Sequence, residues 1–130
     1  MKRQWEVYAT DATRDITFLV ISSDEVNELF SYVTVVPVVT RAEGREVYPI
    51  EAVLPVSFAS STAGRHVGNA EAVPEGHSER DRGGQDGSSV ALVHQIRTLK
   101  ANRLTDRRGA VDDEDARTAV RAAMTAYFGL

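Results

Sequence analysis

Two places in the sequence combine apolar, strand-like runs with polar side chains that could bind a phosphate and transfer a proton. His94 and Gln95 interrupt one apolar run and are followed by Arg97, while Thr40 ends another run and is followed by Arg41. Histidine transfers protons near neutral pH, and a guanidinium or hydroxyl group stabilises negative charge that develops around phosphorus. These groups suit the attack of a ribose 2′-hydroxyl on the adjacent phosphate without a metal.

Each of these residues also has an ordinary structural explanation when it is taken alone. A single histidine in a strand is more often a hydrogen-bonded structural residue than a catalytic one, and a threonine at a strand end is common. Arg14, in the short polar segment that precedes the apolar run at Thr17–Ser22, is a further candidate for a phosphate contact. The set of residues, and no single member of it, indicates RNA cleavage.

Other chemistries lack their usual sequence signatures. The histidines His66, His77 and His94 are scattered, and no spacing of histidines or carboxylates is typical of metal ligands, so we expect no metal site. No Gly-x-Ser-x-Gly motif occurs, and no glycine-rich loop lies between a strand and a helix. We therefore expect no cofactor.

Length and composition predict a single soluble domain. A chain of 130 residues is long enough to bury a core. It contains no cysteine, which excludes disulfides and thiolate metal sites and fits a reducing cytoplasm. No apolar run approaches the roughly 18 residues that cross a membrane, and no apolar leader follows the first basic residues. We expect a cytoplasmic protein without a membrane segment.

The net charge of −4 does not favour nucleic acid, but the charge is unevenly distributed. Between Gln95 and Gly109 several basic residues accompany a single acid, Asp106. The basic residues are Arg97, Lys100, Arg103, Arg107 and Arg108. Binding follows the local field, so this basic strip could contact a short RNA. A solvated surface strip explains the same charges equally well.

Alternating or continuous apolar runs predict a mainly β protein. We expect strands at Gln4–Ala9, Thr17–Ser22, Tyr32–Thr40, Glu46–Val53, Ser89–Thr98 and Arg107–Val111. Pro37 cannot donate to a strand ladder, which predicts a bulge or an edge position there.

Two helices and one turn complete the expected elements. We expect a short helix at Asp24–Phe30 capped by Ser22 or Ser23, and a turn or 3-10 piece at Leu99–Leu104. An amphipathic helix at Asp113–Phe128 should begin at an Asp112 cap and stop at Gly129. Its apolar face comprises Ala116, Val120, Ala123, Met124, Tyr127 and Phe128.

The segment Ser57–Ser88 differs from the rest of the chain. It holds six of the nine glycines and almost no large apolar side chains after Phe58, so it should form a long mobile loop inserted in the domain. The predicted fold is a small SH3-like, open antiparallel β-barrel packed on a C-terminal helix, with residues 1–130 forming one domain.

Four ordered segments carry a resemblance to a known family. They are LVISSDEVN, VTVVPVVTRAEG, EVYPIEAVLP and VALVHQIRTLKANRLTDRRGAV, followed by the closing helix. Together they resemble the MazF/PemK family of toxin endoribonucleases. The resemblance implies a toxin of a type II toxin–antitoxin system that is a homodimer and cuts single-stranded mRNA at specific sequences. It also implies an antitoxin whose disordered tail occupies the RNA groove.

The resemblance assigns roles to several residues. Thr40 matches a family threonine that binds the scissile phosphate, and His94 with Gln95 match a polar pair whose first member is a candidate general base. The family's catalytic arginine stands in an Arg-Pro pair where this chain has Ile16-Thr17, so Arg14 is the local substitute.

The resemblance thus makes Arg14, Thr40 and His94 the expected catalytic residues. Gln95, Arg41 and Arg97 are the expected RNA contacts, and Arg97 is also a candidate for a structural or dimer contact. Two alternatives stay open. One is a non-catalytic toxin of the gyrase-inhibiting, CcdB-like type, which the loss of Arg-Pro favours; the other is an inactive family member.

Overall fold

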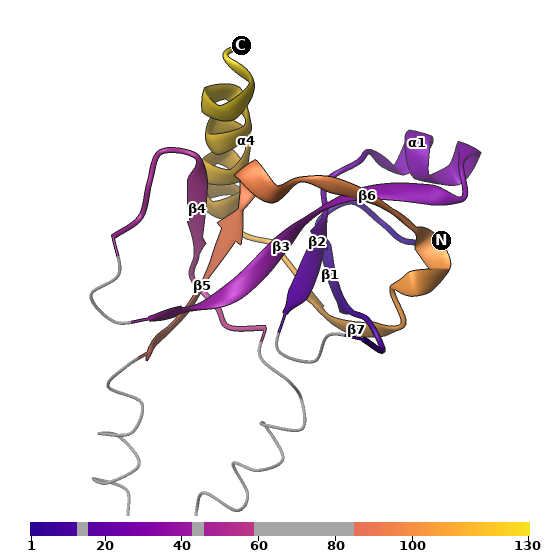
Figure 1. Cartoon of the computed structure of the whole chain (residues 1–130), viewed down its shortest axis with the longest axis horizontal. Helices are drawn as coiled ribbons and strands as arrows, with labels where there is room; N and C mark the ends of the chain where they lie inside the picture. The colour runs from indigo at the N-terminus through magenta and orange to yellow at the C-terminus, as the bar shows by residue number, and fades with distance from the viewer. Residues whose placement is uncertain (13–15, 43–45, 59–84) are drawn as a thin grey trace, which may run out of the picture.

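The sheet of this protein has its strands in the order β4-β5-β3-β2-β1-β7, with all neighbours antiparallel and β6 paired to one end of β3 (Figure 1). The computed structural model describes residues 1–12, 16–42, 46–58 and 85–130. Its strands are β1 (Glu6–Ala9), β2 (Thr17–Val20), β3 (Tyr32–Ala42), β4 (Glu51–Leu54), β5 (Gln85–Leu92), β6 (Arg97–Lys100) and β7 (Asp106–Ala110). The helices are α1 (Asp24–Leu29) and α4 (Glu114–Phe128), with short 3-10 helices η2 (Val93–Gln95) and η3 (Ala101–Arg103).

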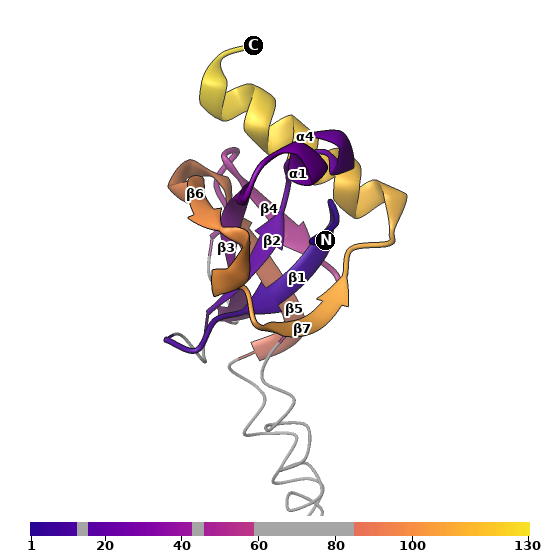
Figure 2. The ribbon, with the colours of Figure 1, turned by 90° about the vertical axis from the view of Figure 1, so that its right-hand side faces the viewer.

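The strands form an open, strongly bent sheet that does not close into a barrel, and α4 packs beside β4 (Figures 1 and 2). This confirms the predicted fold class of a small, open antiparallel β-barrel with a C-terminal helix. α1 lies on the right of Figure 1, near the start of β3 and away from β4. In the part of the chain that the structure describes, no helix is long and apolar enough to cross a membrane.

Two apolar clusters lie on opposite faces of the sheet. Neighbouring residues of one strand, such as Val7 and Tyr8, belong to different clusters, as strand alternation requires. The larger cluster includes Val36 and Val38 and is covered by α4 through residues such as Val120. The smaller one contains Tyr8, Phe18, Val20, Val33, Val35 and Leu104.

α4 docks on the sheet partly through the indole of Trp5. The guanidinium groups of Arg117 and Arg121 each lie 5.3 Å from the Trp5 ring centroid. Trp5 has a positive φ of 77°, and its backbone is held by hydrogen bonds to Val20 and Val111 at 2.7 and 2.8 Å. A non-glycine residue with such a φ costs about 1–3 kcal/mol and persists where its surroundings fix it.

Several predicted elements are confirmed, and others need correction. β1, β2, α1, β3, η3, β7 and α4 lie within about two residues of their expected positions. The predicted strand at Glu46–Val53 is wrong in its first half, because Pro49 lies in a turn closed by Glu51 N donating to Tyr48 O at 2.9 Å. The single strand predicted at Ser89–Thr98 is also wrong, because η2 divides it.

Two details of α4 differ from the sequence expectation. Asp113, and not Asp112, caps the helix, because its Oδ2 accepts from Ala116 N at 3.1 Å. Ala116, Val120 and Ala123 are buried as predicted. Tyr127 and Phe128 are instead exposed, with their rings edge to face at a centroid distance of 5.0 Å.

The predicted loop at Ser57–Ser88 is shorter at its C-terminal end than expected, because Gln85–Ser88 belong to β5. Residues 59–84 of that loop lie outside the described residues, as does Arg14.

Candidate active site

A mismatch in length between two facing segments creates η2. β5 pairs with β3 up to Ala91 opposite Val38, and β6 resumes pairing with Arg97 opposite Val35. Between these pairs β3 has two residues, Val36 and Pro37, whereas the facing chain has five, 92–96. The three extra residues match the length of η2, which carries His94 and Gln95.

Pro37 fits this gap because it has no N–H to donate. Both backbone polar atoms of Thr34 bond toward the β2 side, since Thr34 N donates to Ser22 Oγ and Thr34 O accepts from Ile21 N. Strand alternation then turns the Pro37 nitrogen to the other side, where β5 and β6 leave β3 unpaired. The bulge or edge position predicted at Pro37 takes the form of a break in the ladder, with three extra residues on the facing chain. β3 itself is an interior strand, and its own register shift lies between Thr40 and Ala42.

His94 presents one ring nitrogen for chemistry. Its Nδ1 is buried and has no hydrogen-bond partner among the described residues. Its Nε2 lies 3.5 Å from the side-chain nitrogen of Gln95, which is exposed. That separation is at the outer limit for a hydrogen bond, so a stronger partner could displace Gln95. Nε2 is thus the nitrogen that could exchange a proton with a substrate.

Arg97 lies beside this pair. Its Nε donates to the Gln95 carbonyl at 3.4 Å, and its guanidinium carbon lies 5.6 Å from the centroid of the Phe18 ring. The side chain is exposed, so stacking fixes the plane of the guanidinium while its terminal nitrogens stay accessible. The structure therefore brings together three of the predicted residues, His94, Gln95 and Arg97.

Thr40 and Arg41 lie farther along β3. Thr40 is half-buried and opposite Ser89, four strand residues before Val93. That offset corresponds to on the order of 13 Å, so the Thr40 hydroxyl and the His94 ring do not touch directly. Thr40 also shares a sheet face with Val36 and Val38, whereas Arg97 lies over Phe18 of the opposite cluster. The predicted catalytic group of Arg14, Thr40 and His94 remains a prediction.

The basic strip between Gln95 and Gly109 is partly neutralised. Arg107 Nε pairs with Glu6 Oε2 at 3.0 Å, and Arg108 Nε pairs with Asp106 Oδ2 at 2.8 Å. The exposed side chains of Arg97, Lys100 and Arg103 have no ion pair among the described residues. The positive charge available to a ligand is therefore concentrated on β6 and η3.

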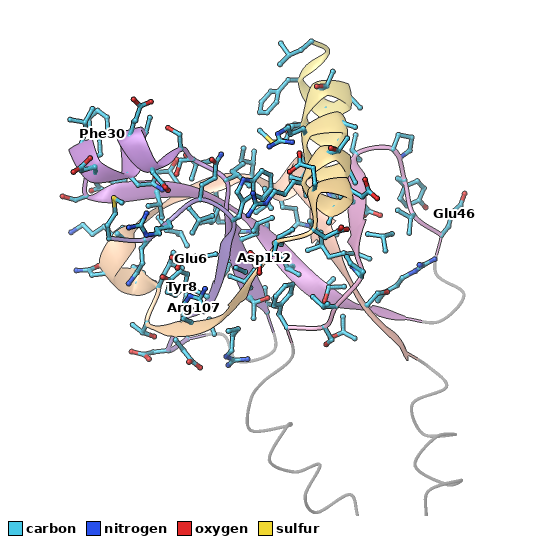
Figure 3. All side chains as sticks on the ribbon, turned by 180° about the vertical axis from the view of Figure 1, so that it is seen from behind. Glu6, Tyr8, Phe30, Glu46, Arg107 and Asp112 are labelled. Carbon is cyan, nitrogen blue, oxygen red and sulfur yellow. The ribbon has the colours of Figure 1, made fainter. Side chains whose placement is uncertain are left out.

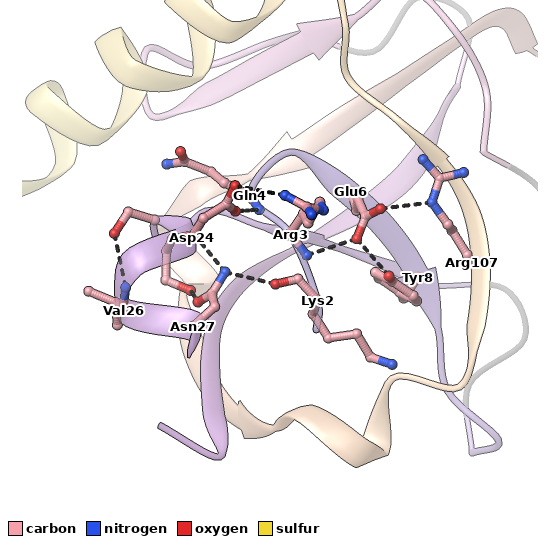
Figure 4. A network of polar contacts seen from close by, with 11 residues as sticks. Lys2, Arg3, Gln4, Glu6, Tyr8, Asp24, Val26, Asn27 and Arg107 are labelled. Atoms are coloured by element: carbon pink, nitrogen blue, oxygen red, sulfur yellow. Dashed lines mark hydrogen bonds and ion pairs between the residues drawn. The ribbon is translucent and has the colours of Figure 1, made fainter. Parts of the chain in front are cut away.

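A hydrogen-bond network around Glu6 partly neutralises Arg107, whose side chain stays 53% exposed (Figures 3 and 4). Tyr8 Oη donates to Glu6 Oε1 at 2.7 Å, and Arg3 N donates to the same oxygen at 2.8 Å. Burial alone would raise the pKa of Glu6, but these bonds and the Arg107 guanidinium together lower it. Burial and the bond to Glu6 raise the pKa of Tyr8 to about 12. Sequence reasoning missed the ion pair in this network because Arg107 lies 101 positions from Glu6.

Among the described residues, no group of three or more histidine, cysteine, aspartate or glutamate side chains could hold a metal ion. The groups near η2 are instead an imidazole, an amide and a guanidinium. Such groups can exchange a proton and bind a phosphate.

The fold and this site define a small, open β-barrel protein with a polar break in its central ladder. A family model described as the PemK-like, MazF-like toxin of type II toxin–antitoxin systems matches residues 5–127. The chain therefore belongs to this toxin family, as the sequence resemblance predicted. The comparison with curated proteins gave no sequence match.

Solved structures show the same fold at low sequence identity. An endoribonuclease from a mycobacterial species, in complex with its cognate antitoxin, superposes with a TM-score of 0.66 at 17% identity over 100% of this chain and 97% of that chain. A MazE–MazF complex from Deinococcus radiodurans gives a TM-score of 0.63 at 18% identity over 99% and 97% of the two chains. MazF alone from the same organism gives 0.60 at 19% identity over 100% and 97%.

Proposed function

We propose that this toxin is an endoribonuclease that cuts single-stranded mRNA at specific sequences without a metal. The observation that carries the proposal is the η2 break, which places His94, Gln95 and Arg97 side by side. Family membership and the endoribonuclease neighbours support it. Attack of a ribose 2′-hydroxyl on the adjacent phosphorus would leave a 2′,3′-cyclic phosphate and a 5′-hydroxyl.

Each residue of the proposed site has a defined task. His94 Nε2 accepts the proton of the attacking 2′-hydroxyl, the bond from phosphorus to the 5′-oxygen breaks, and the leaving oxygen takes a proton from water. The Arg97 guanidinium binds phosphate oxygens. Thr40 and Arg41 contact the RNA backbone farther along β3, and Arg14 supplies the charge that the family's Arg-Pro arginine supplies elsewhere. Since Thr40 lies on the order of 13 Å from η2 along the strands, the bound RNA must extend between the two places.

The proposal includes partners. The structural neighbours include toxins in complex with their antitoxins, so we expect an antitoxin with a disordered tail to cover the basic surface of this chain and become ordered on binding. We also expect a cytoplasmic homodimer built from one domain, residues 1–130. Sedimentation that finds only monomer at micromolar concentration would contradict the dimer.

The test is cleavage of a mixed-sequence RNA by the purified full chain in EDTA. We expect cleavage in EDTA and products that carry a 2′,3′-cyclic phosphate, detected because the 3′ end stays resistant to ligation after alkaline phosphatase and becomes ligatable only when the cyclic ester is first opened by acid. Cleavage that requires added magnesium would overturn the metal-free mechanism. Intact RNA with stabilised gyrase–DNA cleavage complexes would favour the gyrase-inhibiting alternative instead.

A further inference from the structure

An open hollow lies where β3 begins and β6 ends, away from Thr40. Its volume is about 570 Å³, and its lining residues are Ser31, Tyr32, Lys100, Ala101 and Asn102. Ala101 N donates to Ser31 O at 2.8 Å, which fixes η3 against the start of β3. β6 lies at the outside of the sheet in Figure 1, so the hollow opens on an accessible edge.

Tyr32 and Lys100 are direct partners in the β3–β6 ladder. Directly opposite residues of an antiparallel pair project from the same face, so the phenol ring and the lysine amine are side by side. Tyr32 is 48% exposed and lies outside both apolar clusters, so it contributes little to the core. Lys100 is exposed and has no ion pair among the described residues.

The chemistry of the lining suits one nucleotide of a single strand. An exposed aromatic ring offers a stacking platform to any base, and a neighbouring cation attracts the phosphate. The amide of Asn102 and the hydroxyl of Ser31 can donate to or accept from the edge of a base. No acidic residue is among the lining residues, and Tyr32 is the one large side chain with apolar surface there.

The hollow lies at the end of β6 that is farther from η2. Arg97 and Lys100 are the first and last residues of β6, about 10 Å apart along the strand, and strand alternation turns their side chains to opposite faces. Arg103 follows in η3 with an exposed side chain. β6 pairs only with β3 among the described strands, so a strand of RNA that leaves Arg97 would cross the free edge of β6 to reach Lys100 and Tyr32 on the other face.

We propose that the hollow at Tyr32 and Lys100 is a binding subsite for a nucleotide of the RNA that flanks the cleaved phosphate. This inference rests on the proposed function, since it extends the same substrate. The subsite binds by stacking and charge and lies too far from His94 to take part in the chemistry. It should therefore lower KM for long RNA substrates and leave kcat unchanged.

The first experiment measures binding without cleavage. Fully 2′-deoxy oligonucleotides lack the attacking hydroxyl, and their affinity for the full chain is measured by fluorescence anisotropy at increasing length. We expect Tyr32→Ser and Lys100→Gln each to weaken binding of the longer strands about tenfold, with Lys100→Gln also reducing the salt dependence. Tyr127→Ser is the matched control, since Tyr127 is similarly exposed at 42% but lies on α4. Thermal melting confirms that all variants fold.

The second experiment uses cleavable RNA. After the cleavage sequence is read from the product ends, kcat and KM are compared for a minimal RNA and for one with flanking nucleotides. We expect Tyr32→Ser to raise KM for the extended RNA alone. Unchanged binding and unchanged KM in both variants would overturn the subsite, as would failure of the wild type to bind any strand. Loss of self-association or of antitoxin binding in place of nucleic-acid binding would overturn it in favour of a protein interface.

The two proposals can fail separately. A wild type that cuts RNA, with variants identical to it, contradicts the subsite alone. A wild type that binds strands through Tyr32 but leaves RNA intact contradicts the nuclease and keeps the subsite.

Discussion

The guanidinium of Arg97 lies over the ring of Phe18, 5.6 Å from its centroid, and the Arg97 Nε also reaches the carbonyl of Gln95. Phe18 belongs to a buried cluster, so the core of the protein orients an exposed cation beside the η2 turn. Replacing Arg97 tests this arrangement.

Arg97→Ala should lower kcat/KM for RNA cleavage by roughly tenfold to a hundredfold, because a charged hydrogen bond to phosphate is lost. The free energy of unfolding should fall by only about 0.5–1 kcal/mol, the usual contribution of an exposed cation–π contact. Arg97→Lys keeps the charge but loses the planar stack, and we expect an intermediate activity. Equal activity of Arg97→Ala and the wild type would remove Arg97 from the site.

His94→Ala should lower kcat by roughly 10²–10⁴-fold with little change in KM, because a proton acceptor is lost while the phosphate contacts remain. The free energy of unfolding should not fall by more than about 1 kcal/mol, since the variant also removes a buried nitrogen without a partner. Thermal melting checks that the variant still folds. A variant whose kcat is unchanged would show that His94 is structural.

The strands and helices that were predicted well are those that a local sequence pattern specifies. The apolar, β-branched run at Tyr32–Thr40 and the amphipathic pattern of the last helix specify their elements without reference to the rest of the chain. The place where the Ser89–Thr98 run divides was not predictable in this way. It depends on how many residues of β3 lie between the pairing of Val38 with Ala91 and that of Val35 with Arg97.

The candidate site was predictable as a set of residue types but not as a geometry. The sequence suggests Thr40 and His94 as members of one group, yet the β3–β5 register places Thr40 opposite Ser89, five residues before His94. It also suggests that Arg107 is available to RNA, whereas Glu6, 101 positions away in sequence, pairs with it. Long-range pairings of this kind leave no local pattern.

The identity of the α4 cap can be checked with two adjacent carboxylates. Asp113→Ala should lower the free energy of unfolding by about 1 kcal/mol, because Asp113 Oδ2 accepts from Ala116 N. Asp112→Ala should change it by less than about 0.5 kcal/mol, since the Asp112 side chain is 89% exposed and its ion pair with Arg117 is long, at 3.8 Å. Urea denaturation measures both. The reverse order would restore Asp112 as the cap.

The Tyr8–Glu6 pair should give stability a dependence on alkaline pH. The pKa of Tyr8 is raised from 10.0 to about 12 in the folded protein, so the folded state keeps a proton that the unfolded chain loses. The contribution of Tyr8 to the free energy of unfolding should thus be fully present below pH 10 and be lost as the pH rises toward 12. Tyr8→Phe should flatten this slope. Urea melts across this range would contradict the prediction if wild type and variant show the same slope.

Glu6 should make the free energy of unfolding depend on acid pH, with the opposite sign to Tyr8. Its pKa is lowered in the folded protein, so its contribution is present above the ordinary value of 4.5 and is lost as the pH falls through the lowered value. Glu6→Gln should remove this loss of stability at acid pH and should also weaken the interaction with Arg107. An unchanged acid-side slope in Glu6→Gln would exclude this contribution.

Gly109 allows β7 to pass close to the ring of Phe58. Its φ is +152°, which side chains rarely adopt, and an added Cβ would lie 3.1 Å from Phe58 Cε1. Gly109→Ala should therefore cost about 1–3 kcal/mol in unfolding free energy, from backbone strain together with the displaced ring. Gly129→Ala is the matched control, because Gly129 also has a positive φ of 73° but nothing lies within 4 Å of its added Cβ. The control should cost about 1 kcal/mol, the penalty of the left-handed conformation alone. If the two variants lose equal stability in urea denaturation, the Phe58 contact contributes nothing.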